Sequence, residues 1–258
     1  MPTPETASSK NTQPHQDQEV GDQMTLMEHL NELRSRLVKA SVAVLIATAF
    51  SFIFAQQLVE FLAIPLGGLD KMQAIDVTEN VGVFMRVSLI GGMVLAMPVV
   101  VYQTIRFIVP GLTKEERRYL WFIVPTASLL FVLGVAFSYY VMLPAAVPFL
   151  IGFLNIPTRP RPHTYFGFVS QLMFWIGVSF QTPLILAFLA RLGIITPQFL
   201  SKNRRYAIVF IAVLAAAITP TVDPINMALV MGPLIVLYFM SIILARIAYN
   251  PKKVEEED

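Results

Sequence analysis

Six apolar stretches separated by polar segments run through most of the chain. A helix needs about 20 mainly apolar residues to cross the hydrocarbon core of a bilayer, and most of these stretches approach that length. We therefore predict an all-α integral membrane protein with six transmembrane helices. The predicted spans are residues 37–55, 81–102, 119–142, 166–190, 206–218 and 227–244.

The composition supports this class. Of 258 residues, 55% are hydrophobic and only 14% are charged, and the mean hydropathy is +0.64, which excludes an ordinary soluble domain. The net charge of +2 is too small to indicate a nucleic-acid partner. The chain has no cysteine, so neither a disulfide framework nor a thiol site is expected.

The positions of the basic residues predict the orientation. Lysine and arginine concentrate before or at the start of the first span, between the second and third, between the fourth and fifth, and after the sixth. The exceptions are Lys71, Arg86, Arg159 and Arg161. Because basic loops stay on the cytoplasmic side, we expect both termini to be cytoplasmic.

The two ends of the chain differ from the membrane domain predicted at residues 25–249. Residues 1–24 are polar and have no apolar core, so we expect a disordered cytoplasmic tail and not a cleavable signal peptide. Residues 250–258 form a charged cytoplasmic tail.

The segment HLNELRSRL at residues 29–37 leads into the first span. Thr25 followed by Glu28 fits a helix-capping box, so a short amphipathic helix is expected here. Leucines at positions 26, 30, 33 and 37 recur along one side of it. Glu32 and Arg36 are four residues apart and can form an ion pair within the helix. These residues fit either a solvated helix face at the membrane surface or a docking point for a cationic ligand.

A second cytoplasmic acid lies in FIVPGLTKEERR at residues 107–118. Phe107 and Pro110 are typical of a turn at the membrane interface. Thr113 and Glu116 fit another capping box. This segment therefore fits either a capped turn with topology-determining arginines or a second acidic contact for the same ligand.

These two segments, with six spans and both ends cytoplasmic, resemble the TatC family, the multispanning receptor of the twin-arginine protein translocase. The resemblance extends over residues 24–249. It includes AIPL at residues 63–66, SFQTP at 179–183 and ITPTVDP at 218–224. The long cytoplasmic motifs lie at the expected places relative to the predicted spans, which makes chance similarity improbable.

The resemblance implies a receptor for a signal peptide that carries two adjacent arginines. Glu32 and Glu116 match the acidic recognition positions of the family. Two carboxylates at a fixed separation suit a pair of guanidinium groups, because each guanidinium presents a rigid fork of hydrogen-bond donors. The complete site expected from the resemblance and its neighbouring residues is His29, Glu32, Arg34, Phe107, Pro110 and Glu116.

The resemblance also implies partners. They are folded cargo proteins with twin-arginine signal peptides, single-span subunits of the TatA and TatB type, the lipid bilayer, and other copies of this chain in a receptor complex. The expected location is the bacterial cytoplasmic (inner) membrane. No cofactor, metal or nucleic acid is expected.

Gln181 is a departure from the family, which commonly has an intramembrane glutamate at this position. Glutamine keeps the hydrogen bonding and loses the charge. On a helix it shares a face with Ser170, Phe174 and Gly177, which predicts a small polar concavity. Gln181 fits either a hydrogen bond within the bundle or a contact to a partner helix. Thr219 and Asp223, in the turn between the last two spans, complete this expected polar site.

The remaining features concern the fifth span and the outer loops. Residues 206–218 rise only about 20 Å, less than the hydrocarbon core of about 30 Å, so local thinning of the bilayer is expected. The outer loops, residues 56–80 and 143–165, are predicted to form caps that prolines stiffen. We expect their acids Glu60, Asp76 and Glu79 to be solvated.

Two other functional classes fit the sequence less well. An ion- or solute-coupled secondary transporter is the alternative, but such proteins usually carry ionisable residues at mid-membrane, and no Asp or Glu falls inside a predicted span. An enzyme is less consistent with the sequence, because its three histidines are scattered and neither an HExxH nor a GxSxG motif occurs.

Overall fold

The computed structural model describes residues 26–108, 114–152, 158–219 and 224–249, without the side chains of residues 26 and 114–121. Within these ranges all regular structure is helical. The helices are α1 (Leu26–Ile53), α2 (Ala55–Ala63), η1 (Ile64–Leu66), η2 (Leu69–Lys71), α3 (Glu79–Ile108), α4 (Lys114–Phe137), the π-helix η4 (Ser138–Met142), α5 (Leu143–Gly152), α6 (Pro162–Ser179), α7 (Thr182–Arg191), α8 (Pro197–Lys202), α9 (Arg204–Ile218) and α10 (Pro224–Ala248).

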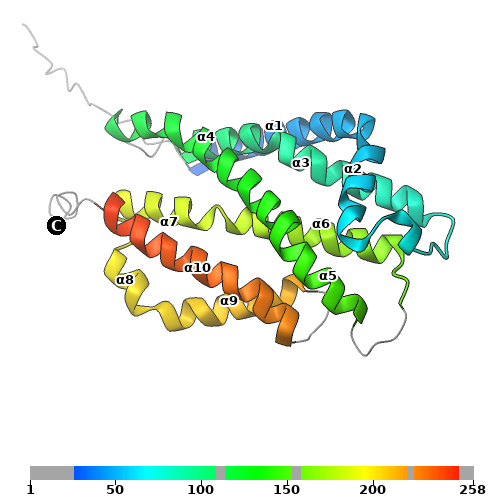
Figure 1. The fold of residues 1–258 in the computed structure, drawn as a ribbon. Coiled ribbons are helices and arrows are strands. Elements are labelled where there is room, and N and C mark those ends of the chain that lie inside the picture. The colour runs from blue at the N-terminus through cyan, green and yellow to red at the C-terminus, as the bar shows by residue number, and fades with distance from the viewer. Residues whose placement is uncertain (1–25, 109–113, 153–157, 220–223, 250–258) are drawn as a thin grey trace, which may run out of the picture.

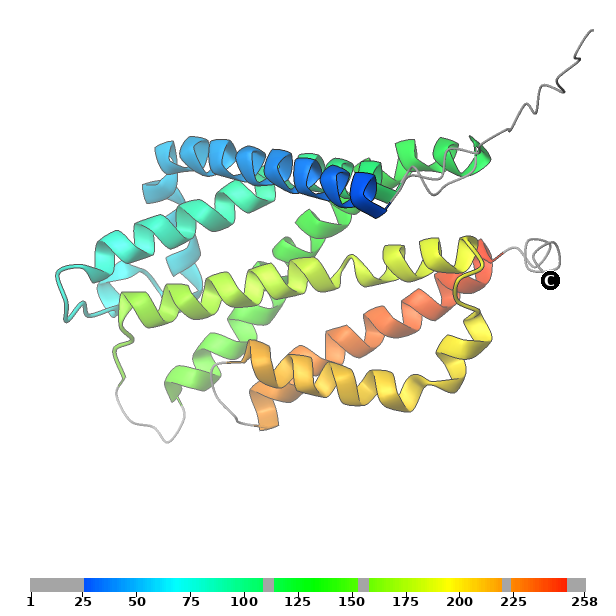
Figure 2. The same cartoon turned by 180° about the vertical axis from the view of Figure 1, so that it is seen from behind.

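The long helices run roughly along one axis of the molecule, and short elements lie at its two ends (Figure 1). One end holds α2, η1, η2 and the starts of α3 and α6. The other end holds the start of α4, the ends of α7 and α10, and α8. The described chain begins and ends at this second end in both views (Figures 1 and 2), as expected if both termini lie on one side of a membrane.

The fold confirms the prediction of an all-helical membrane protein. Within the described residues, five helical segments are long and apolar enough to cross a bilayer. The sequence prediction differs from the structure in two places, because the third segment continues through η4 and α5 to Gly152, and the fourth is two helices joined at Phe180 and Gln181. The predicted fifth span is α9, which has only 15 residues and rises about 22 Å. Together with the five long segments, α9 accounts for the six predicted spans, and it is the shortest of them.

Helix α1 lies at the edge of the bundle and packs mainly against α3 (Figure 2). In the apolar stretch of α1, only 6% of the residues are buried in the bundle. Gly91 and Gly92 of α3 allow the close approach, because a Cβ atom at Gly92 would lie 2.5 Å from the Cα of Thr48. The position of α1 thus depends on a small, tightly packed contact.

Glycines also bring α4 and α6 together in the middle of the bundle. A Cβ atom at Gly134 would lie 2.9 Å from the Cα of Gly177, and one at Gly177 would lie 2.8 Å from the ring of Phe131. At this spacing side chains of one helix reach the backbone of the other. The side chain of Gln181 reaches the backbone of α4 in this way.

The first outer loop is anchored to the bundle by two tyrosines. The hydroxyl of Tyr139 donates to the carbonyl of Phe61 at 2.8 Å, and the hydroxyl of Tyr165 donates to the carbonyl of Leu62 at 2.9 Å. These carbonyls lie in the last turn of α2, where intrahelical donors run out. The prediction of a structured cap is consistent with these bonds.

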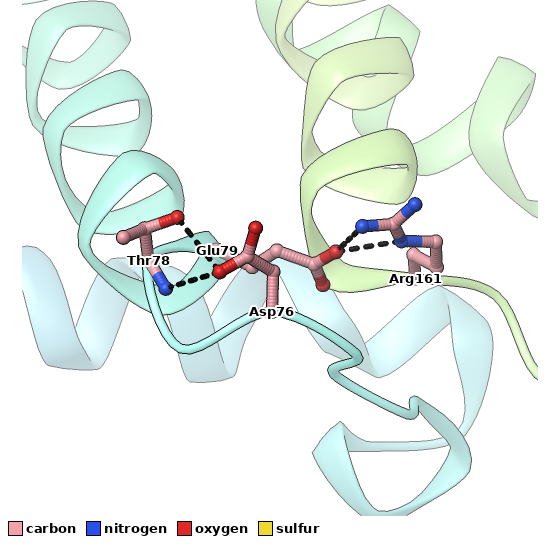
Figure 3. Close-up of polar contacts among 4 residues, drawn as sticks. All are labelled: Asp76, Thr78, Glu79 and Arg161. Atoms are coloured by element: carbon pink, nitrogen blue, oxygen red, sulfur yellow. Dashed lines mark hydrogen bonds and ion pairs between the residues drawn. The ribbon is translucent and has the colours of Figure 1, made fainter.

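Glu79 was predicted to be solvated, and this prediction is wrong. Its side chain is 4% exposed and forms an ion pair with Arg161, whose Nε lies 2.6 Å from Oε1 of Glu79 (Figure 3). The pair joins the start of α3 to the start of α6, and the backbone of Gln73 also donates to the carbonyl of Pro160. The two outer loops are therefore joined by charge as well as by backbone.

Glu60 and Asp76 are exposed, as predicted. Asp76 accepts hydrogen bonds from the backbone N–H and the hydroxyl of Thr78 (Figure 3). These bonds, the backbone one first, lower the pKa of Asp76 below its ordinary value. Asp76 thus shapes the turn that leads into α3.

Candidate functional site

The start of α1 and the end of α3 form a polar contact at the end of the bundle where the described chain begins and ends. Glu32 and Arg36 of α1 make the ion pair predicted from their spacing, with Nη2 of Arg36 3.0 Å from Oε1 of Glu32. Nη1 of Arg36 also donates to Oε1 of Gln103 on α3 at 3.4 Å. Arg36 therefore joins the two helices through a shared polar cluster.

An aromatic stack lies on the same helix faces. The rings of His29 and Phe107 have centroids 4.4 Å apart and planes 26° apart. His29 is three residues before Glu32 on α1, and Phe107 is four residues after Gln103 on α3, so both rings lie on the faces that carry the polar cluster. Aromatic faces bind guanidinium groups by stacking and cation–π attraction. We name His29, Glu32, Arg36, Gln103 and Phe107 the Glu32 cluster.

The Glu32 cluster is only partly satisfied. The side chain of Glu32 is 17% exposed and that of Arg36 is 21% exposed. Oε2 of Glu32 and Nε of Arg36 are buried without a hydrogen-bond partner among the described residues. Leaving such groups unpaired is costly, about 1 to 3 kcal/mol each. The carboxylate consequently has capacity for a further donor.

Three of the six residues predicted for the recognition site lie in the Glu32 cluster, namely His29, Glu32 and Phe107. Arg34 is exposed and forms no ion pair with any described residue. Glu116 lies in the first turn of α4, but its side chain is outside the described residues, as is the whole of Pro110. Their part in the site stays a prediction.

Gln103 was missed at the sequence level. It lies within the apolar run of α3, four residues before Phe107, and this spacing puts both side chains on one face. A polar residue at that distance from a predicted site residue was the available signal. Its partner, Arg36, became evident only from the packing of α1 against α3.

Comparison with known proteins identifies the family. The family model described as "Sec-independent protein translocase protein (TatC)" matches residues 28–233. This match includes both helices of the Glu32 cluster. The chain belongs to the TatC family.

Individual relatives agree along nearly the whole length. The chain is 36% identical over 237 residues to a TatC protein of Desulforapulum autotrophicum, and the aligned region covers 90% of this chain and 87% of the relative. It is 38% identical over 233 residues to TatCy of Bacillus subtilis, with coverage of 89% and 91%. The crystal structure of a twin-arginine translocase receptor, TatC, superposes with a TM-score of 0.77 at 36% identity, covering 86% of this chain and 99% of that one.

TatC is a component of a membrane-embedded protein translocase and not an enzyme family, so the predicted family and the non-enzymatic class are confirmed. The secondary-transporter alternative is therefore set aside. In the part of the chain that the structure describes, no group of three or more His, Cys, Asp or Glu side chains is arranged to hold a metal ion.

In this TatC protein Gln181 lies at the break between α6 and α7. Its Nε2 donates to the carbonyl of Ala127 on α4 at 3.0 Å, and the residue is 8% exposed. The expected concavity exists nearby as a cavity of about 340 Å³, whose lining includes Arg86, Ser170 and Phe174 but not Gln181. The arrangement favours the hydrogen bond within the bundle over a contact to a partner helix.

The other two members of the expected intramembrane polar site differ from each other. Thr219 is 7% exposed, and its hydroxyl donates to the carbonyl of Ala215 at 3.0 Å, which closes the last turn of α9. Asp223 lies outside the described residues. Whether Gln181, Thr219 and Asp223 form one site therefore stays a prediction.

Replacement of Gln181 tests its bond to α4. Gln181→Leu should lower the free energy of unfolding by about 1 kcal/mol, the value of an interhelical hydrogen bond in a membrane. Gln181→Glu can keep the bond only while its carboxyl is protonated, which burial favours, so this variant should lose stability as the pH rises. Denaturant unfolding of the three proteins in one detergent measures this. A Leu variant as stable as the original would contradict the donor role.

Proposed function

We propose that this TatC protein binds the twin-arginine signal peptides of folded proteins at the cytoplasmic face, and that the Glu32 cluster is one half of the binding site. The observation that carries the proposal is the state of Glu32. Its carboxylate is held by a single arginine of its own helix, and its second oxygen lacks a partner among the described residues. An arginine of the peptide supplies the donors that this carboxylate lacks.

Arg36 acts as an internal substitute for the ligand. An ion pair at four-residue spacing on a helix contributes only about 0.2 to 0.5 kcal/mol, so exchanging Arg36 for a peptide guanidinium costs little. The released Arg36 keeps its contact with Gln103. The His29–Phe107 stack offers a flat surface beside the carboxylate for the incoming planar group.

Glu116 is the proposed second contact. One carboxylate binds one arginine, whereas two carboxylates, on α1 and α4, bind two arginines in a fixed order. Phe107 and Pro110 shape the loop between α3 and α4, and Arg34 contacts lipid phosphate or the peptide backbone. Lysines in the peptide keep the charge but lose the forked geometry, so they should bind less well.

The proposal extends to the membrane location of the protein and to its assembly with partner subunits. Both termini are cytoplasmic, in the cytoplasmic membrane of a bacterium, because the basic loops lie at the end of the bundle with the Glu32 cluster. Subunits of the TatA and TatB type associate with the membrane domain, and several copies of the chain form the receptor complex. The short helix α9 thins the bilayer next to it and favours this assembly.

Photo-crosslinking of a twin-arginine signal peptide to the purified protein tests the proposal. Glu32→Gln removes the charge and keeps the shape, and it should lower the apparent affinity roughly tenfold to a hundredfold, the value of a charge-assisted bond. Glu60→Gln is the matched control, because Glu60 is an exposed acid at the opposite end of the bundle.

A twin-lysine peptide completes the experiment. It should label the original protein weakly and should be less sensitive to Glu32→Gln. Equal labelling by the two peptides, or unchanged labelling of the Glu32 variant, would contradict recognition of arginine by this carboxylate. The same measurement on Glu116→Gln tests the second half of the site.

A further inference from the structure

Residues of α8, α9 and α10 line a cavity of about 640 Å³. Helix α8 and the end of α10 lie at the end of the bundle where the described chain begins and ends (Figure 1). The cavity is distinct from the Glu32 cluster, whose residues come from α1 and α3. Its lining is strongly basic and contains no acid. The lining residues are Pro197, Gln198, Ser201, Lys202, Arg204, Arg205, Arg246 and Tyr249.

Among the described residues, no carboxylate pairs with the four cations of this cavity. Lys202, Arg204, Arg205 and Arg246 form no ion pair with any residue in the described ranges. By contrast, Arg36 and Arg161 are both paired with glutamates. Four like charges around one cavity repel each other, and an anion that binds among them removes this cost. The charge pattern therefore points to an anionic ligand.

The walls of the cavity are held in place by specific bonds. The side chain of Thr196 accepts from the N–H of Phe199 and caps α8. The amide of Asn203 donates to the carbonyl of Phe199 at 3.0 Å at the other end of α8. The hydroxyl of Tyr238 on α10 donates to the carbonyl of Leu200 at 2.7 Å. Helix α8 is consequently fixed against α10, and the backbone that carries the basic side chains is held in place.

An apolar cavity of about 200 Å³ lies further along the same helices. On α9, Ala207, Ile211 and Leu214 line it, and they follow Arg204 at helical spacing on one side of the helix. On α10, Leu234, Leu237 and Tyr238 line it, about two to three turns before Arg246. A basic cavity at the membrane surface is therefore followed, along α9 and α10, by an apolar one inside the membrane.

We propose that these two cavities form a binding site for an anionic phospholipid. The phosphodiester headgroup binds among Lys202, Arg204, Arg205 and Arg246, with Ser201 and Tyr249 available as hydrogen-bond donors. An acyl chain lies in the apolar cavity between α9 and α10. A free phosphate would satisfy the cations, but only a lipid also fills the apolar part, so we assign the lipid as the occupant. This inference does not depend on the proposed signal-peptide site.

Native mass spectrometry of the purified protein with added lipid tests the proposal. Phosphatidylglycerol and phosphatidylcholine with identical acyl chains separate headgroup charge from chain binding. The original protein should retain phosphatidylglycerol about tenfold better than phosphatidylcholine. Since each basic residue near an anionic surface favours binding of the anion, Arg204→Gln with Arg246→Gln should reduce that retention by about tenfold or more.

The matched control is Arg106→Gln with Arg159→Gln, which removes the same charge from two exposed arginines outside both cavities. It should leave the preference for phosphatidylglycerol unchanged. Equal loss in the control and the cavity variant would overturn the proposal, since the effect would then be one of net charge. Equal retention of both lipids by the original protein would also overturn it, without reference to any variant.

A competition arm distinguishes a lipid from a soluble anion. Inorganic phosphate added to the complex should leave phosphatidylglycerol bound, because it cannot replace the contacts of the acyl chain. Displacement of the lipid by millimolar phosphate would instead show a site for a soluble phosphate and would overturn the assignment to lipid. Phe210→Ser, in the apolar cavity, should weaken both lipids and leave the preference between them.

Discussion

Replacing Gly92 with alanine is expected to push α1 away from α3 and to lower the free energy of unfolding by about 1 to 3 kcal/mol, the usual cost of overpacking. The new Cβ atom would lie 2.5 Å from the Cα and 2.6 Å from the N of Thr48. Backbone atoms cannot rotate aside as a side chain can, so the whole helix must shift. Helix α1 has few other buried contacts to hold it.

The same replacement should also weaken signal-peptide binding. Arg36 of α1 reaches Gln103 of α3 across the interface that Gly92 keeps narrow, and His29 stacks on Phe107 across it too. Separating the helices would lengthen both contacts. Thermal unfolding in detergent and peptide crosslinking measure the two effects on one sample.

Gly82→Ala is the matched control for this prediction. Gly82 lies on the same helix, and a Cβ atom there would meet nothing within 4 Å. Because alanine favours a helix over glycine by about 1 kcal/mol, this variant should be as stable as the original or more so. Equal stability of the Gly92 and Gly82 variants would show that the close approach of α1 and α3 is not required.

The second large effect concerns the Glu79–Arg161 pair, whose two halves are unequal. The side chain of Glu79 is 4% exposed, whereas that of Arg161 is 48% exposed. Arg161→Met keeps most of the stem and leaves a buried carboxylate without its cation, which should cost about 2 to 3 kcal/mol. This is below the cost for a fully buried pair because water reaches Arg161. Glu79→Gln leaves an arginine that water can hydrate, and should cost about 1 kcal/mol.

The double variant tests the reason for this asymmetry. Glu79→Gln combined with Arg161→Met removes the buried charge together with its partner, so it should be more stable than Arg161→Met alone. Denaturant unfolding of the four proteins gives the coupling energy between the two positions. Arg159→Met, at an exposed arginine two residues away, serves as the control. Equal costs for the two single variants would contradict the account based on burial.

The local pattern was sufficient for much of the Glu32 cluster. The spacing of Glu32 and Arg36 predicts an ion pair on any helix, and the structure confirms it. The contacts that join the cluster across helices were not predictable in the same way. Gln103 follows Arg36 by 67 residues and Phe107 follows His29 by 78, and only the packing of α1 on α3 brings these residues together.

Gln181 and Glu79 illustrate the same limit. Gln181 was expected to share a concavity with Ser170, because both lie on one face of a continuous helix. The helix breaks at Phe180 and Gln181, and the amide turns to the backbone of α4. Glu79 was expected to be solvated in its outer loop, but the approach of the second outer loop brings Arg161 to it.

The sequence by itself determined the membrane class, the order of the helices, the short fifth span, the acid before the first span and the membership of the TatC family. These properties depend on hydropathy, spacing and motifs, which are local along the chain. Only the tertiary structure decided which polar groups are satisfied and by what. Glu79 is paired across two outer loops, Gln181 is bonded to α4, and four cations at α8, α9 and α10 are left facing one cavity. Such pairings depend on distances between segments far apart in the chain, and local patterns do not contain those distances.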